Sequence, residues 1–354
     1  MAKHRKGDKK KKPLALRITL WVLLGILVAV LAVGGYYLIR LNGMTDNSVQ
    51  VTEPPADIKT PEPEPSLEPV ESPDDLDVDY DDPLDGGVYE ESIYKVDTID
   101  ENVVNILVLG EDTREGESGG RSDTMMVLSY NKKTGTAKLV SVLRDTYVPI
   151  AGHGTWNRVN TAYRFGGVGM AINTINQNFG LDIQYYISTD FQNMQEMVDM
   201  LGGLELTLTK EEAAYINKTT KTSDLPEEDG TYTLNGAQVL THSRNRKMGD
   251  GDWGRTRRQR DVLLSFFNRA KQEKDVASLL SLINGMTEHV KTNMSLGMML
   301  DLGKAAVFSG NFTLQGGHIP FDKTWNYARV NGASVIKADL DKNKELVLEF
   351  LYEK

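Results

Sequence analysis

One uncharged apolar run divides this chain into two unequal parts. The run extends from Ile18 to Ile39 and follows a basic segment, residues 1–17. It is about 22 residues long, close to the roughly 20 that cross the hydrocarbon core of a bilayer as a helix, so we predict a transmembrane helix over residues 18–39. Lysines precede the run and acidic residues follow it. The positive-inside bias therefore predicts a single pass through the cell membrane, with a cytoplasmic N-terminus and an extracellular remainder.

A cleavable signal peptide is the alternative to this membrane anchor. The apolar part of such a peptide is usually roughly 7 to 15 residues long, shorter than the run seen here. The nearest small-residue site, Ala32-Val33-Gly34, falls inside the run rather than after it. Both features favour the anchor.

Residues 40–98 have a different composition, rich in Pro, Glu, Asp, Ser and Thr. Little apolar surface can be buried there, so we predict a disordered, extended linker that holds the next domain away from the membrane. The carboxylates of Asp74–Asp85 could suggest a calcium loop. That segment lacks the central glycine and terminal glutamate of an EF-hand, so we interpret it as linker.

Residues 99–354 are predicted to form one extracellular domain. The chain contains no cysteine, so this domain folds without disulfides and has neither thiolate metal ligands nor a cysteine nucleophile. The five histidines of the whole chain show no paired metal-ligand spacing, which argues against a zinc site.

Short apolar runs alternate with helical patterns along this domain. Val103–Leu109 is a predicted buried strand, and Thr124–Tyr130 and Thr136–Leu143 flank the turn NKKTG, which predicts a hairpin. The alternation continues to the end of the chain, which predicts an α/β fold with a mixed central β-sheet covered by helices on both faces. Further predicted strands cover 183–188, 204–209 and 312–319, with a turn-containing segment at 330–339. Predicted helices begin at or just after residues 158, 190, 210, 235, 255, 275, 295 and 342.

Two of these helices carry a start signal. Asp190 is positioned to cap the helix that runs to Met200, and Asn235 to cap GAQVLTHSR. Gly202 and Gly203 are expected to close the first of them. The methionines of this helix, like Tyr185 and Tyr186, are more typical of an ordinary core than of a lipid cavity.

Arginines are concentrated between His242 and Asp261, although the chain carries a formal net charge of -10. Such a cluster predicts contact with a concentrated negative charge, because guanidinium groups offer planar, paired donors to phosphate oxygens. The alternative is a solvated basic helix face paired with Asp250, Asp252 and Asp261. The cluster comprises Arg244, Arg246, Arg255, Arg257, Arg258 and Arg260.

Two aspartates flank a glycine-rich loop earlier in the chain. Asp112 and Asp123 stand beside Arg114 and Arg121, and Arg144 ends a neighbouring predicted strand. Mg²⁺ binds proteins through one or two carboxylates and takes its other ligands from water and substrate phosphates. Phosphoryl transfer needs mainly positioning and charge neutralisation. The alternative is that the two aspartates merely pair with the loop arginines.

Several ordered motifs resemble the LytR-CpsA-Psr family. The resemblance covers most of residues 100–270 and agrees with one N-terminal span before an exported domain. The motifs are Asn105-Ile106-Leu107 followed by GEDTR, RSDTMM from Arg121, SVLRDTYV from Ser141, RVNTAYRFGG from Arg158, and SRNR with DWGRTRRQ up to Gln259.

The resemblance implies a membrane-embedded, Mg²⁺-dependent or Mn²⁺-dependent phosphotransferase. Such enzymes move an anionic glycopolymer, a teichoic acid or capsule, from a polyprenyl-pyrophosphate carrier to peptidoglycan and join the two by a phosphodiester. The family fold implies an apolar cavity for the prenyl chain. Carried over by position, Asp112 and Asp123 are the implied metal ligands, and either could accept the proton of the attacking hydroxyl.

The same positions imply the remaining site residues. The implied pyrophosphate contacts are Arg114, Arg121, Arg144, Arg244, Arg246, Arg255 and Gln259, and the implied catalytic residues are Asp112, Asp123, Arg144, Arg244 and Arg246. The sequence departs from the family pattern in two places. Leu143 stands where proline is usual, and residues 247–252 separate Arg246 from Trp253, which leaves the role of Asp252 open.

Other functions are weaker interpretations of the same residues. A polyanion receptor would favour basic residues spread along a face with aromatic groups between them, and we predict no nucleic-acid partner. A transcription regulator would need more than the roughly 17 residues before the span. A polyprenyl-pyrophosphate pyrophosphatase could use the same site with water as acceptor. The G-x-S-x-G match around Ser118 lies in a loop before a strand, not in the strand-to-helix turn of a hydrolase.

Overall fold

The computed structural model describes residues 46, 48–56, 58–70, 92–112, 121–248, 251–272, 276–286, 288–308 and 313–353. The predicted transmembrane segment and the Asp74–Asp85 segment lie outside these residues. Within them, no helix combines the length and the apolar character needed to span a bilayer.

The described chain contains the following elements. Its strands are β1 (Val51–Thr52), β2 (Glu68–Pro69), β3 (Ile93–Tyr94), β4 (Val103–Asp112), β5 (Arg121–Asn131), β6 (Thr136–Val142), β7 (Thr146–Pro149), β8 (Trp156–Arg158), β9 (Tyr185–Asp190), β10 (Leu204–Leu208), β11 (Gly230–Leu234), β12 (Lys291–Thr292), β13 (Thr313–Ile319), β14 (Trp325–Val330) and β15 (Ala333–Ala338). Its helices are α2 (Thr161–Phe179), α3 (Phe191–Met200), α4 (Lys210–Thr220), α5 (Gly236–Arg244), α6 (Gly251–Ala270), α7 (Val276–Met286), α8 (Leu296–Phe308) and α9 (Leu340–Tyr352).

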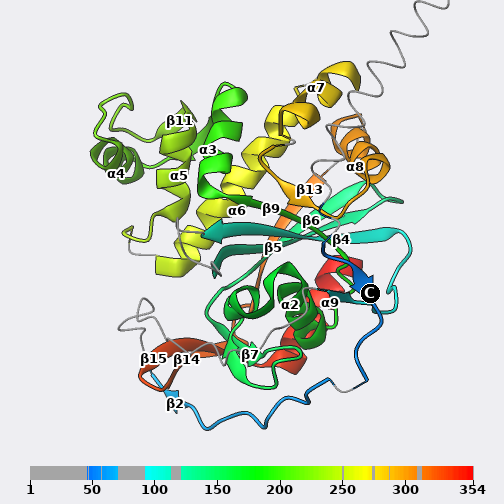
Figure 1. The fold of residues 1–354 in the computed structure, drawn as a ribbon. Helices are drawn as coiled ribbons and strands as arrows, with labels where there is room; N and C mark the ends of the chain where they lie inside the picture. Colours follow the sequence, from blue (N-terminus) through cyan, green and yellow to red (C-terminus); the bar gives the residue numbers. More distant parts are fainter. Residues whose placement is uncertain are drawn as a thin grey trace, which may run out of the picture.

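A six-stranded mixed sheet forms the centre of the domain, in the order β12-β9-β4-β5-β6-β13. β4, β5 and β6 are antiparallel, whereas β9 runs parallel to β4 and β13 runs parallel to β6. Helices α3, α6, α7 and α8 lie on one side of this sheet, and α2 and α9 lie on the other (Figure 1). The predicted hairpin and the predicted mixed α/β architecture are confirmed.

The structure adds sheets that the sequence analysis did not separate. The predicted strand at 204–209 is β10, which pairs with β11 instead of joining the central sheet. Its residues alternate between buried and exposed, because one face packs on a small core with α4, α5 and α6. A five-stranded sheet, in the order β2-β14-β15-β7-β8, lies beside the central one (Figure 1).

The predicted helix start signals are confirmed. The Asp190 side chain accepts a hydrogen bond from Asn193 N at 2.8 Å at the start of α3, and Asn235 forms a reciprocal capping box with Gln238 at the start of α5. Gly202, which follows the C-cap residue Leu201 of α3, has a φ of 77°, a conformation that costs glycine little. These caps fix where α3 and α5 begin, and both helices border the candidate site.

The main core lies between the central sheet and the α2–α9 pair. It contains apolar residues of β4, β5, β6 and α2 that are almost fully buried. Asn105 of β4 is also buried and donates to the hydroxyl of Tyr352, which donates in turn to Asp182. The side of the central sheet with α3, α6, α7 and α8 is packed less completely, because it encloses a cavity.

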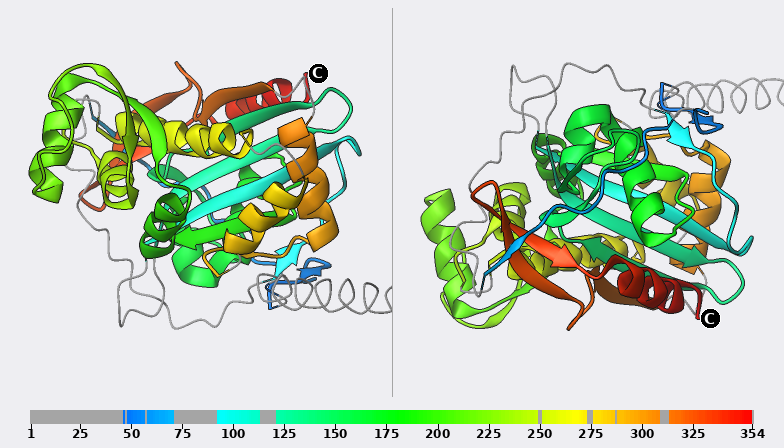
Figure 2. Two further views of the ribbon diagram at one scale, coloured as in Figure 1. Left: turned by 90° about the horizontal axis from the view of Figure 1, so that it is seen from above. Right: turned by 90° about the horizontal axis from the view of Figure 1, so that it is seen from below.

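Part of the predicted free linker packs against the domain. β1 pairs with β3, β2 pairs with β14, and Val49 is 5% exposed. The indole Nε1 of Trp156 donates to Glu62 O at 2.7 Å. Figure 2 shows this strap, residues 48–56 and 58–70, running across the second sheet. The expectation of a disordered linker is therefore corrected for these residues, because their backbone supplies hydrogen bonds that composition does not reveal.

Candidate functional site

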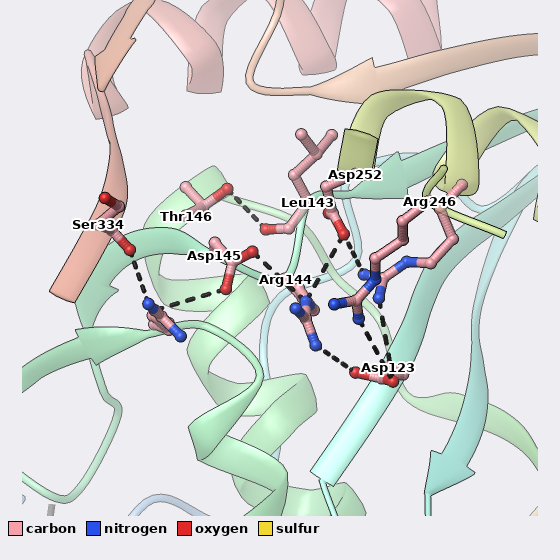
Figure 3. Close-up of polar contacts among 10 residues, drawn as sticks. Asp123, Leu143, Arg144, Asp145, Thr146, Arg246, Asp252 and Ser334 are labelled. Atoms are coloured by element: carbon pink, nitrogen blue, oxygen red, sulfur yellow. Dashed lines mark hydrogen bonds and ion pairs between the residues drawn. The ribbon is translucent and has the colours of Figure 1, made fainter. Parts of the chain in front are cut away.

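Asp123 projects from an irregularity at the end of the β4–β5 hairpin. Gly110 pairs with Thr124 and Glu111 pairs with Ser122, so Asp123 is the extra residue of a bulge in β5. Bulges change the direction of a strand and often aim a side chain at a site. The Asp123 side chain is 16% exposed and faces a group of arginines (Figure 3).

A tight turn after β6 places Arg144 opposite Asp123. Leu143 N donates to Ile319 O at 2.9 Å, and Leu143 O accepts bonds from the backbone and the hydroxyl of Thr146. A proline at position 143 would lack the first of these donors. Leu143, which stands where the family pattern has proline, therefore ties the turn to β13 through its backbone N–H.

Three guanidinium groups surround the Asp123 carboxylate. Arg144 Nη1 donates to Oδ1 at 2.7 Å. Oδ2 lies 3.9 Å from Arg246 Nη2 and 4.0 Å from Arg255 Nη1, beyond hydrogen-bond distance. Figure 3 shows the side chains converging from β5, the β6–β7 turn, the loop after α5, and α6.

Asp252 is a second carboxylate at this site. It is 5% exposed, forms an ion pair with Arg255, and lies 3.7 Å from Arg144 Nε. Burial raises the pKa of Asp252 to about 7, and nearby Asp145 adds to this, while Arg144 and Arg246 oppose it. The sequence left the role of Asp252 open. The structure shows that Asp252 belongs to the cluster.

A fully buried aspartate, Asp145, supports the cluster through its contacts with arginines. Asp145 Oδ2 lies 3.4 Å from Arg144 Nε, and Asp145 Oδ1 lies 3.4 Å from Arg158 Nε. Arg158 also donates to Ser334 O of β15 at 2.7 Å. Asp145 thus connects the site to the second sheet. The sequence motifs assigned no role to Asp145, and its only signal was its position next to Arg144.

The loop that carries Arg246 is held by a buried arginine of α6. Arg258 is 1% exposed, and its Nη2 donates to Asn245 O at 2.6 Å. Its Nη1 also donates to Glu212 of α4 at 3.2 Å. Arg258, predicted as one member of the anion cluster, is therefore a structural support for Arg246.

An apolar cavity of about 400 Å³ lies under α3, α6, α7 and α8, against the central sheet. Gly110 and Thr124, next to the bulge, line it together with Ser243 and Gln259. Thr189, Asp190 and Thr292 also line it, but most of the wall is apolar and includes Met126, Leu128, Phe191, Leu263, Phe266 and Leu282. The cavity therefore begins beside the arginines and continues as a hydrocarbon-like space.

Two of the three α3 methionines belong to this cavity, and the third, Met200, is 52% exposed. Met194 and Met197 line it, whereas Tyr186 is fully buried in the main core. The expectation of ordinary core is therefore confirmed for Tyr186, whereas Met194 packs against the small core, Met197 is buried, and both also line the cavity. A buried helix face has the same spacing in both cases, so the sequence pattern did not distinguish them.

The remaining predicted site residues fall into two groups. Arg244 is exposed and its guanidinium lies 4.4 Å from the ring centre of Phe191, at the cavity wall, while Gln259 lines the cavity itself. The backbones of Asp112 and Arg121 pair at the end of the β4–β5 hairpin, two residues before Asp123. The side chains of Asp112 and Arg121, and all of Arg114 and Ser118, lie outside the described residues.

Among the described side chains, that of Asp123 is suited to be one carboxylate ligand of a magnesium ion. No group of three or more His, Cys, Asp or Glu side chains that could hold a metal occurs among the described residues. Asp123 Oδ2 has no hydrogen-bond-length contact with Arg246 or Arg255, and Asp112 is close in the strand register. Mg²⁺ commonly uses one or two carboxylates with substrate phosphates, so the residues fit such an ion.

The fold and the site together define an α/β domain with an arginine cluster around Asp123 beside an apolar cavity. The sequence profile of the LytR_cpsA_psr family matches residues 78–348. The chain belongs to the LytR-CpsA-Psr family, as its sequence motifs suggested.

Related proteins carry names that describe their function. The chain is 35% identical over 202 residues to the polyisoprenyl-teichoic acid–peptidoglycan teichoic acid transferase TagU of Bacillus mycoides, covering 57% of this chain and 64% of that protein. It is 33% identical over 230 residues to TagU of Bacillus cereus, covering 63% and 73%. A solved structure described as TagT bound to LI-WTA superposes with a TM-score of 0.60 and 26% identity, covering 73% of this chain and 94% of that one.

Proposed function

We propose that this protein transfers an anionic, polyisoprenyl-pyrophosphate-linked glycopolymer of the teichoic acid class to peptidoglycan. The observation that carries the proposal is the position of the arginines, which converge on Asp123 at the start of an apolar cavity. A lipid pyrophosphate has the same two parts, a compact anion joined to a hydrocarbon chain. The TagU relatives and the TagT structure support this assignment.

The pyrophosphate would lie against Arg144, Arg246 and Arg255, with Arg244 at the edge of the site. Guanidinium groups match phosphate oxygens and neutralise the charge that develops as phosphoryl transfer proceeds. Asp145 and Asp252 hold Arg144 and Arg255 in place before substrate arrives. Such preorganised charges need little rearrangement during the reaction.

In the proposed reaction a peptidoglycan hydroxyl attacks the phosphorus attached to the glycopolymer. A phosphodiester forms between polymer and peptidoglycan, and polyprenyl phosphate leaves with its charge neutralised by the arginines. The hydroxyl proton passes to a carboxylate, and Asp123 and Asp112 are the candidates. Asp123 and Asp112 would hold Mg²⁺, which supplies additional charge neutralisation at the phosphate oxygens.

The chain's position in the cell is part of the proposal. Residues 18–39 would anchor it in the cell membrane, with the N-terminus in the cytoplasm and the catalytic domain outside. This places the site on the side of the membrane where peptidoglycan lies.

A transfer assay with purified full-length protein tests this function. The donor is a lipid-linked teichoic acid precursor, the acceptor is peptidoglycan, and products are separated with and without Mg²⁺. We expect a phosphodiester-linked polymer from the wild type, loss of that product in Arg144→Ala, and retention in Arg257→Ala, whose side chain is exposed on α6. Release of phosphorylated polymer without any peptidoglycan product would instead indicate a pyrophosphatase. Salt-sensitive binding without Mg²⁺ dependence or turnover would indicate a polyanion receptor.

A further inference from the structure

The described chain enters the domain at Asp46, and this entry point is firmly held. Tyr186 donates from its hydroxyl to Asp46 Oδ2 at 2.9 Å, and Asp46 N donates to Thr292 O at 2.7 Å. Three residues later, Val49 is buried in the main core. Asp46 is therefore fixed to the β9–β12 edge of the central sheet.

The connection from this anchor to the proposed membrane span is short. Asp46 is seven positions after Ile39, and seven extended residues reach at most about 25 Å. A domain of about 250 residues has a radius of gyration of about 18 Å and is therefore more than about 40 Å across. The connection cannot pass around the domain, so the edge that carries Asp46 must face the bilayer. This differs from the expectation of a linker that holds the domain away from the membrane.

Two apolar helices lie at that edge. α8 begins at Leu296, four positions after Thr292, and α7 packs against it. Figures 1 and 2 show α8 and the start of the described chain on the same side of the domain, whereas α4 lies at the opposite end. In the sequence of α8, LGMMLDLGKAAVF, the charged residues are Asp301 and Lys304.

The same two helices form a wall of the cavity. Leu282 and Met286 of α7 and Met299 of α8 line it. Met298, next to Met299, is half-buried and lies outside the described lining of the cavity. The layer formed by α7 and α8 thus separates the cavity from one side of the domain. This is the side that the short connection turns toward the membrane.

We propose that the α7–α8 face rests on the bilayer that holds this chain's own membrane span. The donor's polyprenyl chain then passes between bilayer and cavity through this face without crossing water. The inference rests on the proposed membrane anchor and the proposed lipid-linked substrate. The residues described as exposed on α7 and α8 are small or charged, namely Ala277, Ser281, Gly285, Gly297, Asp301 and Lys304, so this face would lie at the level of the lipid headgroups. A hydrocarbon chain that passes from the bilayer into the cavity there avoids the unfavourable hydration of its methylene groups.

Depth-dependent fluorescence quenching tests this orientation. The chain has no cysteine, so Met298→Cys and Thr219→Cys each give a single labelling site, the second on the exposed surface of α4. Each full-length variant is labelled with an environment-sensitive fluorophore and reconstituted into vesicles that contain doxyl-labelled lipid. We expect several-fold stronger quenching at position 298 than at 219. Equal quenching at both positions would overturn the proposed face.

A longer connection tests why the face is oriented this way. Insertion of about 30 Gly and Ser residues after Gly43 adds a flexible reach of roughly 30 Å. We expect quenching at position 298 to fall toward the value at 219, and undiminished quenching would refute the short connection as the cause. Flotation of the vesicles separates the underlying proposals. Protein that fails to float disproves the membrane anchor and this inference with it, whereas quenching without transfer activity disproves the enzymatic function alone.

Discussion

Arg144 Nη1 lies 2.7 Å from Asp123 Oδ1, although Asp123 belongs to β5 and Arg144 to the turn after β6. The bulge in β5 turns Asp123 toward the site, and the turn after β6 brings Arg144 to meet it. Asp145 and Asp252 then fix the same guanidinium through its Nε atom. This arrangement lets one arginine connect the candidate metal ligand to the two other carboxylates of the cluster.

Replacement of Asp123 by Asn removes the charge that the three arginines surround. We expect Asp123→Asn to lower the transfer rate by at least about 100-fold, because a positioned charge at the reacting phosphate is lost. Initial rates over a range of Mg²⁺ concentrations measure the effect, with exposed Asp341→Asn as the control. A rate and a Mg²⁺ dependence equal to those of the wild type would remove Asp123 from the site.

Arg144→Lys keeps the charge but loses the planar, branched donor. A lysine ammonium cannot contact Asp123 and the two other carboxylates in the same geometry, so we expect kcat/KM to fall by roughly 100-fold. Arg244→Lys, at the exposed edge of the site, is expected to lower it less. Steady-state kinetics of the two variants give the order, and the reverse order would contradict the placement of Arg144 at the centre.

The raised pKa of Asp252 makes stability depend on pH. The folded state holds this proton up to about pH 7, whereas the unfolded carboxyl releases it near its ordinary value of 3.8. The stability contributed by protonated Asp252 is therefore present below about pH 4 and is lost as the pH rises to about 7. We expect the free energy of unfolding of Asp252→Asn to decline less between pH 5 and pH 8 than that of the wild type.

Urea unfolding at a series of pH values measures this slope, with Asp341→Asn as the reference. An identical slope in wild type and Asp252→Asn would mean that Arg255 keeps Asp252 ionised throughout this range.

A larger side chain in the cavity is expected to affect donors with a long prenyl chain more than donors with a short one. Leu263 lines the cavity from α6, and Leu263→Trp would occupy space that a long prenyl chain needs. We expect KM for a long-chain donor to rise by roughly 10-fold or more, with little change for a short-chain donor, because overpacking excludes only the hydrocarbon. Val51→Trp, at an exposed position of β1, is the control. An equal effect on both donors would place the prenyl chain elsewhere.

The features that the sequence predicted correctly depend on local signals. Asp190 and Asn235 cap the next residues in the chain, and the NKKTG turn joins neighbouring strands, so each can be recognised within a few positions. The convergence of Asp123 with Arg144, Arg246 and Arg255 was expected because the family motifs occur in their usual order. How close these side chains come to one another depends on the fold and could not be read from the sequence.

The features that the sequence missed depend on distant partners. β7 pairs with β15, which lies almost two hundred positions later, and β2 is held by β14. Composition predicted a free linker at the strap, since backbone hydrogen bonds do not depend on residue type. The alternative of arginines paired with nearby aspartates was half right. Asp252 does pair with Arg255, but both side chains are buried, not solvated.

The pairing of β2 with β14 has a consequence beyond the site. β14 lies next to the outer edge of the second sheet, and Glu68 and Pro69 cover part of that edge. The family match begins later, at residue 78. A fragment trimmed to the family boundary would leave β14 with open backbone donors and acceptors, which invite strand addition by another copy. Self-association of such a fragment would then be a property of the cut, and the intact strap would keep the protein monomeric at that edge.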